Sequence, residues 1–198
     1  MVVRNLTPSD YPKLADVHTS AFSGFFLTSL GTTFLRTYYK SCLKDKTTIA
    51  CGITDEHDNF LGFATGTINS KGYHRRILFD NLFLFLISIG RAVLARPRIL
   101  LRLIKNLEKN QKIEDKQDYS ELLSIGVRPE SKGKGIGEML FFAFEKEAKE
   151  RGAAKIALTT DLLNNDKVIN FYYKCGLEKF YEFQTYPNRK MIKMIKEL

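Results

Sequence analysis

The junction between two runs of different periodicity constrains the fold more than any other part of the chain. Residues 119–127 form an aliphatic run of the length and composition of a strand. Residues 136–148 carry apolar side chains at the i, i+3, i+4 and i+7 spacing of an amphipathic helix. Gly133, Gly135 and Gly137 stand at alternate positions between them. We therefore predict a strand, a tight turn that uses the backbone freedom of glycine, and a helix.

Further strand and helix patterns surround this junction. A capping hydroxyl and a proline, in residues 7–10, predict the start of a first helix, and residues 24–29 are expected to form a loop. The remaining expected elements are strands at 2–5, 47–54, 60–68, 155–160, 177–185 and 189–195 and helices at 30–43 and 167–174. This order predicts one mixed α/β (α+β) domain over residues 1–198, with helices flanking a single sheet.

Composition limits the class of protein without choosing a function. The chain has 198 residues, 44% of them hydrophobic and 27% charged, which is typical of a globular domain. A formal net charge of +9 suits an anionic ligand, a nucleic acid or an anionic membrane surface. The three scattered cysteines match no metal-binding spacing, and no signal peptide or membrane-spanning run occurs. We expect a soluble, cytoplasmic protein with reduced thiols.

The glycine turn, residues 132–137, has two interpretations. It can be a plain turn with solvated lysines, or a cradle for a diphosphate. The first amides of a helix have no partner within the helix, and the helix dipole makes that end positive. Lys132 and Lys134 add charge, and glycine lets the backbone approach a phosphate closely. The turn lacks the GxxxxGK[ST] of a P-loop and the GxGxxG of a dinucleotide fold.

Two motifs resemble one known family. "VRPESKGKGIGEML" is similar to the acyl-CoA binding motif of the GNAT superfamily of N-acetyltransferases, with Lys132 where the family usually has Gln or Arg. "NDKVINFYYKCGL", residues 165–177, is similar to a second motif of that family. The likeness covers residues 1–69 weakly and 119–198 well. Residues 70–118 lie outside it.

This resemblance implies a fold, an activity and a set of binding residues. The sheet would be mostly antiparallel, with parallel central strands at 122–127 and 155–160 that splay apart. Acetyl-CoA would be the co-substrate, and no metal is expected. Its pantetheine arm would lie along Ile125 and Val127, and Asn165 and Phe171 would contact it from the second motif. Its pyrophosphate would lie on the amides of Lys132, Gly133, Lys134, Gly135, Ile136 and Gly137.

The resemblance also suggests how the acetyl group would move to an amine. Tyr172 stands where the family places the acid that protonates the departing thiolate, although a tyrosine on an amphipathic helix can simply be part of the core. Tyr173 is the alternative if the register differs by one. Glu121 is the candidate base, or else an exposed strand end. His18 and His74 are weaker candidates for a base, and a packed His18 is the simpler interpretation.

Asn165 also has a structural interpretation, because its position before the helix at 167–174 suits a helix cap.

The insert, residues 70–118, is apolar and basic. We expect helices at 77–92 and 98–109 with a break at Pro97. It can cover the acceptor side of the sheet, hold an anionic acceptor such as a nucleotide-linked amino sugar, or lie on a membrane surface. The alternative acceptors are a peptide N-terminus, a lysine or a polyamine. No nucleic-acid motif occurs, so we expect no nucleic-acid partner, and we expect a monomer or homodimer.

Overall fold

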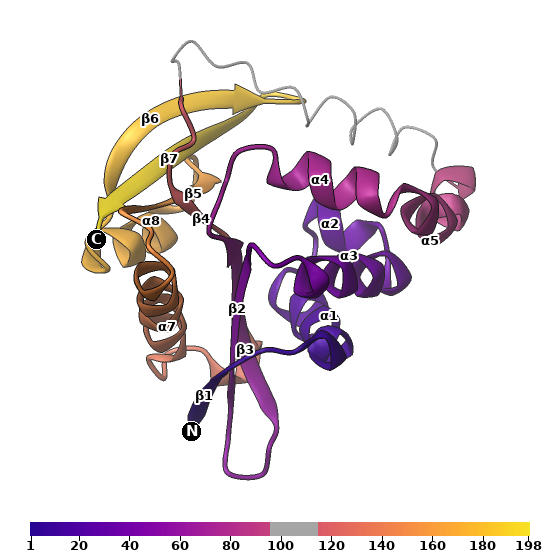
Figure 1. Cartoon of the computed structure of the whole chain (residues 1–198), viewed down its shortest axis with the longest axis horizontal. Coiled ribbons are helices and arrows are strands. Elements are labelled where there is room, and N and C mark those ends of the chain that lie inside the picture. Colours follow the sequence, from indigo (N-terminus) through magenta and orange to yellow (C-terminus); the bar gives the residue numbers. More distant parts are fainter. Residues whose placement is uncertain (96–114) are drawn as a thin grey trace.

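The computed structural model describes residues 1–95 and 115–198, and these build a seven-stranded sheet in the order β1-β2-β3-β4-β5-β7-β6 (Figure 1). The strands are β1 Val2–Asn5, β2 Thr48–Thr54, β3 Phe60–Thr67, β4 Ser120–Val127, β5 Lys155–Asp161, β6 Glu178–Thr185 and β7 Arg189–Glu197. Neighbouring strands run antiparallel except β4 and β5, which are parallel. This mixed sheet is the fold class predicted above.

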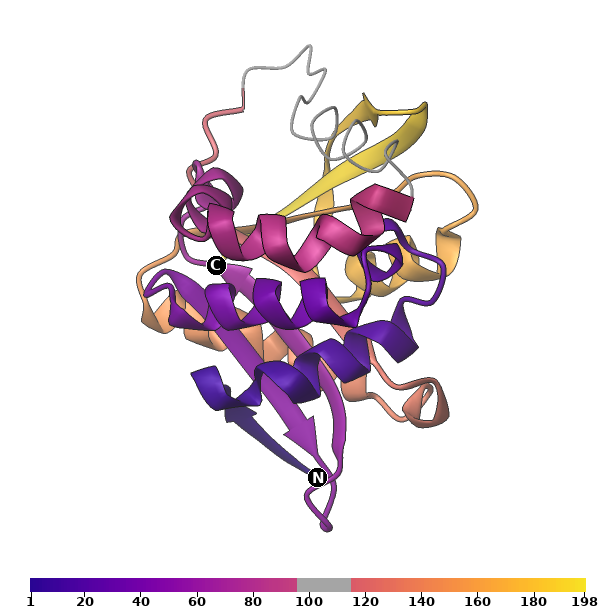
Figure 2. The same cartoon turned by 90° about the vertical axis from the view of Figure 1, so that its right-hand side faces the viewer.

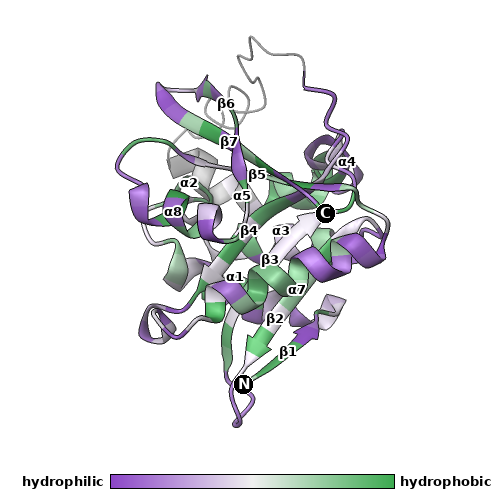
Figure 3. Ribbon diagram, turned by 90° about the vertical axis from the view of Figure 1, so that its left-hand side faces the viewer, coloured by the Kyte–Doolittle hydropathy of each residue, from purple (hydrophilic) through white to green (hydrophobic). Residues whose placement is uncertain are grey.

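Helices cover both faces of the sheet. They are α1 Tyr11–Ala21, α2 Phe26–Ser29, α3 Thr32–Lys44, α4 Tyr73–Asp80, α5 Leu82–Ala95, α7 Ile136–Glu150 and α8 Asp166–Lys174. Figure 2 shows the face covered by α1 and α3, with α5 packed against α3 and α4 next to α5. Figure 3 shows the opposite face, which α7 and α8 cover. Along the chain β4 leads into α7 and β5 leads into α8, so both predicted motifs lie at the ends of these two strands.

Each face has its own apolar core. The apolar stripe of α7 places Leu140, Phe141 and Phe144, all with no exposed surface, against the sheet. On the other face, Leu14 of α1 and Leu35 of α3 are equally buried and pack together with residues of β3. Burying side chains of this size stabilises a fold by roughly 1.5–3 kcal/mol each relative to exposure. These two cores hold the central strands from both sides.

Strands β4 and β5 separate soon after they meet. They pair only at Ser120–Ile156, Glu121–Ala157 and Leu122–Leu158. The register between β3 and β4 also shifts here: Gly66 lies opposite Leu122, and Thr65 lies opposite Ser124. Leu123 is therefore the extra residue of a β-bulge, which bends a strand and ends its regular pairing. The predicted splay of the two parallel strands is present.

Two local predictions were wrong. The expected loop at 24–29 contains the short helix α2, because Phe26 and Leu27 pack against the neighbouring cores and order the segment. The first helix of the insert is interrupted at Asn81, which separates α4 from α5. Asn81 ends α4 in a non-helical conformation, and its side chain donates to the carbonyl of Ile77. The expected helix at 98–109 and the break at Pro97 lie outside the described residues.

None of the helices in the described ranges is long and apolar enough to cross a membrane.

Candidate active site

The glycine turn leads into the N-terminus of α7. Gly133 and Gly135 have φ angles of 79° and 75°, in the left-handed region that favours glycine. Gly135 is the N-cap of α7, so no side chain of its own can cap the helix there. Among the described residues, no atom lies within 4 Å of the position that a side chain on either glycine would take. The surroundings of both glycines are therefore open, which suits the approach of an anion to the helix N-terminus.

The charges around this turn suit a phosphate. Lys132 and Lys134 are both exposed on the turn that precedes α7. Ile136, by contrast, is the first residue of α7, and its buried side chain packs in the core. Its contribution to binding a ligand would come from its backbone amide. The side chains of both lysines are thus exposed next to the backbone amides that are predicted to bind the pyrophosphate.

Beyond the bulge a gap opens between β4 and β5, and it leaves the middle of the sheet partly exposed. Leu123, Ser124 and Ile125 are only partly buried, although β4 is the central strand of seven. Val127, at the end of β4, is also partly buried. The edge of β4 that faces β5 pairs with no strand of the described residues from Leu123 onward. An extended ligand with amide groups can pair with such an edge.

Helix α8 closes the gap from one side. The ring of Phe171 lies 3.6 Å from the position of a Cβ on Gly137, an ordinary van der Waals distance, so Phe171 lies beside the first turn of α7. Asn165 occupies the N-cap position of α8 but forms no side-chain cap. Its amide instead donates to Thr160 Oγ1 and to the Asp161 carbonyl, each at 2.9 Å. The prediction that the Asn165 side chain caps α8 is therefore wrong, because that side chain binds the end of β5 instead.

Tyr172 faces the core between α8 and the sheet. It is 7% exposed and belongs to the same cluster as Leu140 and Phe144. Burial raises the pKa of its phenol above the ordinary value, so the group is protonated at neutral pH. A protonated phenol is the form that an acid needs. Tyr173, the alternative, is 46% exposed on the outer side of α8.

Glu121 is buried in an ion pair. Its Oε1 accepts a hydrogen bond from Lys193 Nζ, and its Oε2 accepts one from the hydroxyl of Ser70. Lys193 itself has no exposed surface. The alternative of an exposed strand end is therefore wrong, because β7 and the start of the insert cover this end of β4. A base at this position would first have to give up its lysine partner.

The ion pair belongs to a larger polar network. Lys193 Nζ lies 4.6 Å from the ring centroid of Tyr119. The hydroxyls of Tyr119 and Tyr181 both donate to Asp115 Oδ2, at 2.6 and 2.7 Å. Burial alone raises the pKa of Asp115, but these hydrogen bonds lower it by more, so its pKa lies below the usual range. Burial and the contact with Asp115 raise the pKa of both phenols.

This network joins both ends of the insert to the sheet, through Ser70 and Asp115. Glu121 was a candidate from the sequence, whereas its partners Lys193 and Ser70 were not. The only signal was a lysine, Lys193, between two apolar residues of a predicted strand.

His18 lies on the other side of β4 from α7. It is 4% exposed, and its Nδ1 lies 2.6 Å from the hydroxyl of Tyr39. Burial lowers the pKa of His18 to about 4, so the ring is neutral near pH 7. Its Nε2 has no hydrogen-bond partner among the residues that the structure describes. The simpler interpretation, a packed histidine, is confirmed. His74 is exposed on α4.

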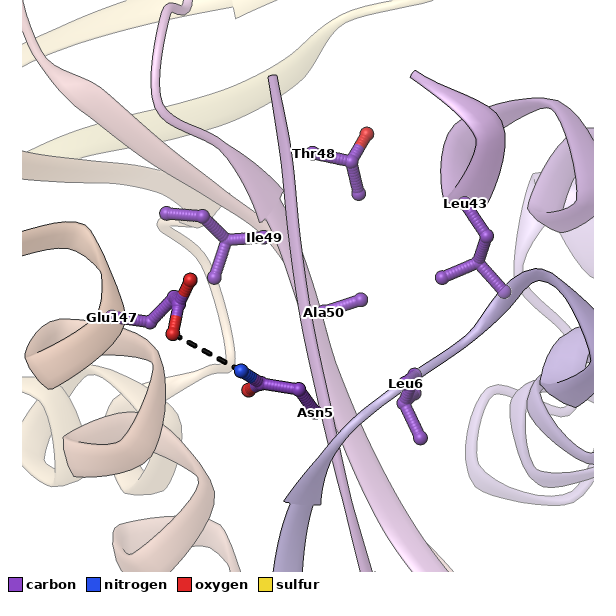
Figure 4. A pocket seen from close by; sticks show the side chains of 7 residues that line it. All are labelled: Asn5, Leu6, Leu43, Thr48, Ile49, Ala50 and Glu147. Atoms are coloured by element: carbon purple, nitrogen blue, oxygen red, sulfur yellow. Dashed lines mark hydrogen bonds between the residues drawn. The ribbon is translucent and has the colours of Figure 1, made fainter. Parts of the chain in front are cut away.

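A pocket elsewhere is not part of this site. It has a volume of about 170 Å³ and is lined by Asn5, Leu6, Leu43, Thr48, Ile49, Ala50 and Glu147 (Figure 4). Asn5 Nδ2 donates to Glu147 Oε2 across it, at 3.2 Å. Glu147 is near the C-terminal end of α7, whereas the glycine turn precedes its first residue. Within residues 1–95 and 115–198, no group of His, Cys, Asp and Glu could hold a metal ion.

Comparisons with known proteins agree with this arrangement. Residues 99–177 match the model of the "Acetyltransferase (GNAT) family". A ribosomal-protein-alanine N-acetyltransferase from Brucella melitensis superposes with a TM-score of 0.63 at 16% identity, covering all of both chains.

Two further solved structures are similar in fold. A point mutant of the spermidine N-acetyltransferase SpeG from Vibrio cholerae has a TM-score of 0.61 at 15% identity, over 100% of this chain and 95% of that one. The PaiA N-acetyltransferase from Thermoplasma acidophilum, in complex with coenzyme A, has a TM-score of 0.55 at 15% identity, over 100% and 98%. A search of curated proteins found no match.

Proposed function

We propose that the chain is an acyl-CoA-dependent N-acetyltransferase of the GNAT family, whose model matches residues 99–177, and that it transfers an acetyl group from acetyl-CoA directly to a primary amine of a small polar acceptor. The observation that carries the proposal is the gap between β4 and β5 that ends at the uncapped N-terminus of α7. A strand edge open to a ligand, followed by the first amides of a helix, suits an extended ligand with amides in its arm and a diphosphate at its end.

The cofactor-side residues then have separate tasks. The backbone of Ile125 and Val127 would pair with the amides of the pantetheine arm. The amides from Lys132 to Gly137 would bind the pyrophosphate, with Lys132 and Lys134 neutralising its charge. Phe171 and Asn165 would contact the arm from α8. We assign these tasks to the residues by the resemblance of their motifs and by their places around the gap.

Two groups would act on the thioester, and a third would take the proton of the amine. Transfer requires a polarised thioester carbonyl, attack by a neutral amine, and a proton for the sulfur that leaves. A backbone N–H near Val127 would donate to the carbonyl oxygen. Tyr172, which is protonated but buried in the core beneath α8, would give its proton to the sulfur once the two groups come into contact. Glu121 would accept the amine proton only after Lys193 had moved, so water is an equally suitable acceptor.

An anionic acceptor, such as a nucleotide-linked amino sugar, is the first choice of substrate. Residues 71–112 contain ten Lys and Arg residues but only two acidic residues, Asp80 and Glu108. The insert begins at Ser70, which bonds Glu121 on the central strand, so it starts beside the acceptor side of the gap. The second candidate is a peptide N-terminus or a polyamine. Two of the similar solved structures are named for activity on a ribosomal-protein alanine and on spermidine, which favours that candidate.

Two experiments test the proposal in sequence. Isothermal titration with acetyl-CoA should give a heat of binding, and the absence of both heat and a thermal shift at millimolar ligand would refute the cofactor assignment. An acceptor panel should then include nucleotide amino sugars, polyamines, amino acids, aminoglycosides and peptides with free N-termini. Turnover of peptides or polyamines alone would replace the anionic acceptor with the second candidate.

A further inference from the structure

Helices α4 and α5 expose an apolar surface that the catalytic proposal does not use. Six large apolar side chains within nine residues are at least 42% exposed, and Phe83, at 74%, is the most exposed of them. We call this set the α4–α5 patch: Phe79, Leu82, Phe83, Leu84, Leu86 and Ile87. Monomeric soluble domains rarely leave so many large apolar side chains together in water, and such a patch marks an interaction surface.

The patch lies on the solvent-facing side of α4 and α5, and the opposite side of both helices is buried. Phe85 of α5 is 3% exposed, and its ring centroid lies 5.4 Å from that of Phe34 on α3. Tyr73 and Ile77 of α4 are buried in the same cluster. The outward side chains are therefore not needed for packing α5 on α3. Figure 1 places α5 at the edge of the molecule farthest from α7 and α8.

The exposed charged side chains around the patch are mostly basic, although Asp80 of α4 is exposed beside Phe79. Lys71, His74 and Arg75 are exposed near the start of α4. Between Asp58 and Glu108 the sequence has one acidic residue, Asp80. The excess of eight positive charges over residues 71–112 accounts for most of the formal charge of +9. Among the described residues next to the patch, the exposed Lys71 and Arg75 outnumber the exposed Asp80, which favours an anionic partner over a second copy of this chain.

We propose that the α4–α5 patch docks the protein on the surface of an anionic lipid bilayer. Exposed apolar side chains beside basic ones are the combination that binds such surfaces, by inserting into the interface while attracting acidic headgroups. The patch lies on the bilayer and does not cross it. The 14 residues of α5 span roughly 21 Å, short of the hydrocarbon core of about 30 Å. This proposal does not depend on the identity of the acceptor.

Vesicle flotation tests the proposal with the full chain. The protein should float with vesicles of phosphatidylcholine mixed with phosphatidylglycerol and remain behind with phosphatidylcholine alone. Added salt should weaken the binding, because it screens the basic side chains. Phe83→Glu should lower the partition coefficient by about tenfold or more, the loss expected for an apolar side chain that leaves the interface.

Two further variants make the experiment specific. Phe142→Glu is the matched control, because Phe142 is 43% exposed on α7, on the opposite face of the sheet. It should bind vesicles as the unaltered chain does. Arg75→Glu should weaken binding to the anionic vesicles, and thermal unfolding should show that each variant is folded.

The proposal is overturned if the unaltered chain ignores anionic vesicles, binds neutral ones equally well, or loses as much binding with Phe142→Glu as with Phe83→Glu. A dimer that Phe83→Glu dissociates would overturn it too, because a second copy would then cover the patch.

Discussion

Replacing Lys193 should test whether the ion pair with Glu121 holds the centre of the sheet. The lysine side chain has no exposed surface and the carboxylate has 9%. Lys193→Met keeps the length of the side chain but leaves a buried carboxylate without its cation. Breaking a buried pair in this way typically costs about 3–5 kcal/mol. That is a large share of the roughly 5–15 kcal/mol by which a domain is stable, and it corresponds to a fall in Tm of about 10 °C.

A double-mutant cycle separates the pair from its parts. Glu121→Gln should also destabilise, because it leaves Lys193 buried, whereas the double variant should recover at least about 2 kcal/mol of the summed loss. Urea unfolding followed by circular dichroism suits the measurement, since the chain has no tryptophan.

The control for this cycle is the exposed pair of Lys155 and Glu197, 3.4 Å apart on β5 and β7. Its coupling should be below about 1 kcal/mol. Losses below about 1 kcal/mol for both single variants at the buried pair, or a double variant as unstable as the sum of the two, would refute this account.

Three further predictions concern the site and its surroundings. Tyr172→Phe should lower kcat about 100-fold or more with unchanged acetyl-CoA affinity, measured by steady-state kinetics and titration; an unchanged kcat would mean that water or Tyr173 supplies the proton, or that chemistry does not limit the rate. Gly135→Val should abolish acetyl-CoA binding in titration, whereas Gly152→Val, equally left-handed with φ of 86° but at the far end of α7, should keep it; equal losses would implicate backbone strain alone. Burial lowers the pKa of His18 to about 4, so the folded state binds fewer protons than the unfolded one, and stability should fall by about 3 kcal/mol from pH 6.5 to pH 4. His18→Gln should flatten that slope in unfolding at several pH values, and an unchanged slope would contradict the assignment.

The elements with strong periodicity were predictable from the sequence. Residues 136–148 show a clear helical repeat, and α7 begins at Ile136 as expected. The strand before it ends at Val127, two residues before Pro129, also as expected. Local sequence decides such elements, because the spacing of apolar residues already selects the face that is buried.

Features that depend on distant residues were not predictable. Lys193 and Glu121 are 72 positions apart, and no local pattern pairs them. The bulge at Leu123 follows from the register between β3 and β4, which only the folded sheet defines. Asn165 matches a capping position, yet its side chain binds Thr160 and Asp161 instead. Of the candidate site, the glycine turn was therefore predictable, whereas the surroundings of Glu121 were not.

The short pairing between β4 and β5 makes the sheet two half-sheets joined by a narrow seam. Strands β1 to β4 form one half and β5, β7 and β6 form the other, with three residue pairs between them. By comparison, β5 and β7 share seven residue pairs. Local opening should therefore need least energy along this seam, and amide hydrogens beyond Leu122 should exchange fastest within the core. A ligand that bonds the edge of β4 and also contacts Asn165 and Phe171, which follow β5, would connect the two halves, so its binding would appear as slower exchange in strands that it never touches.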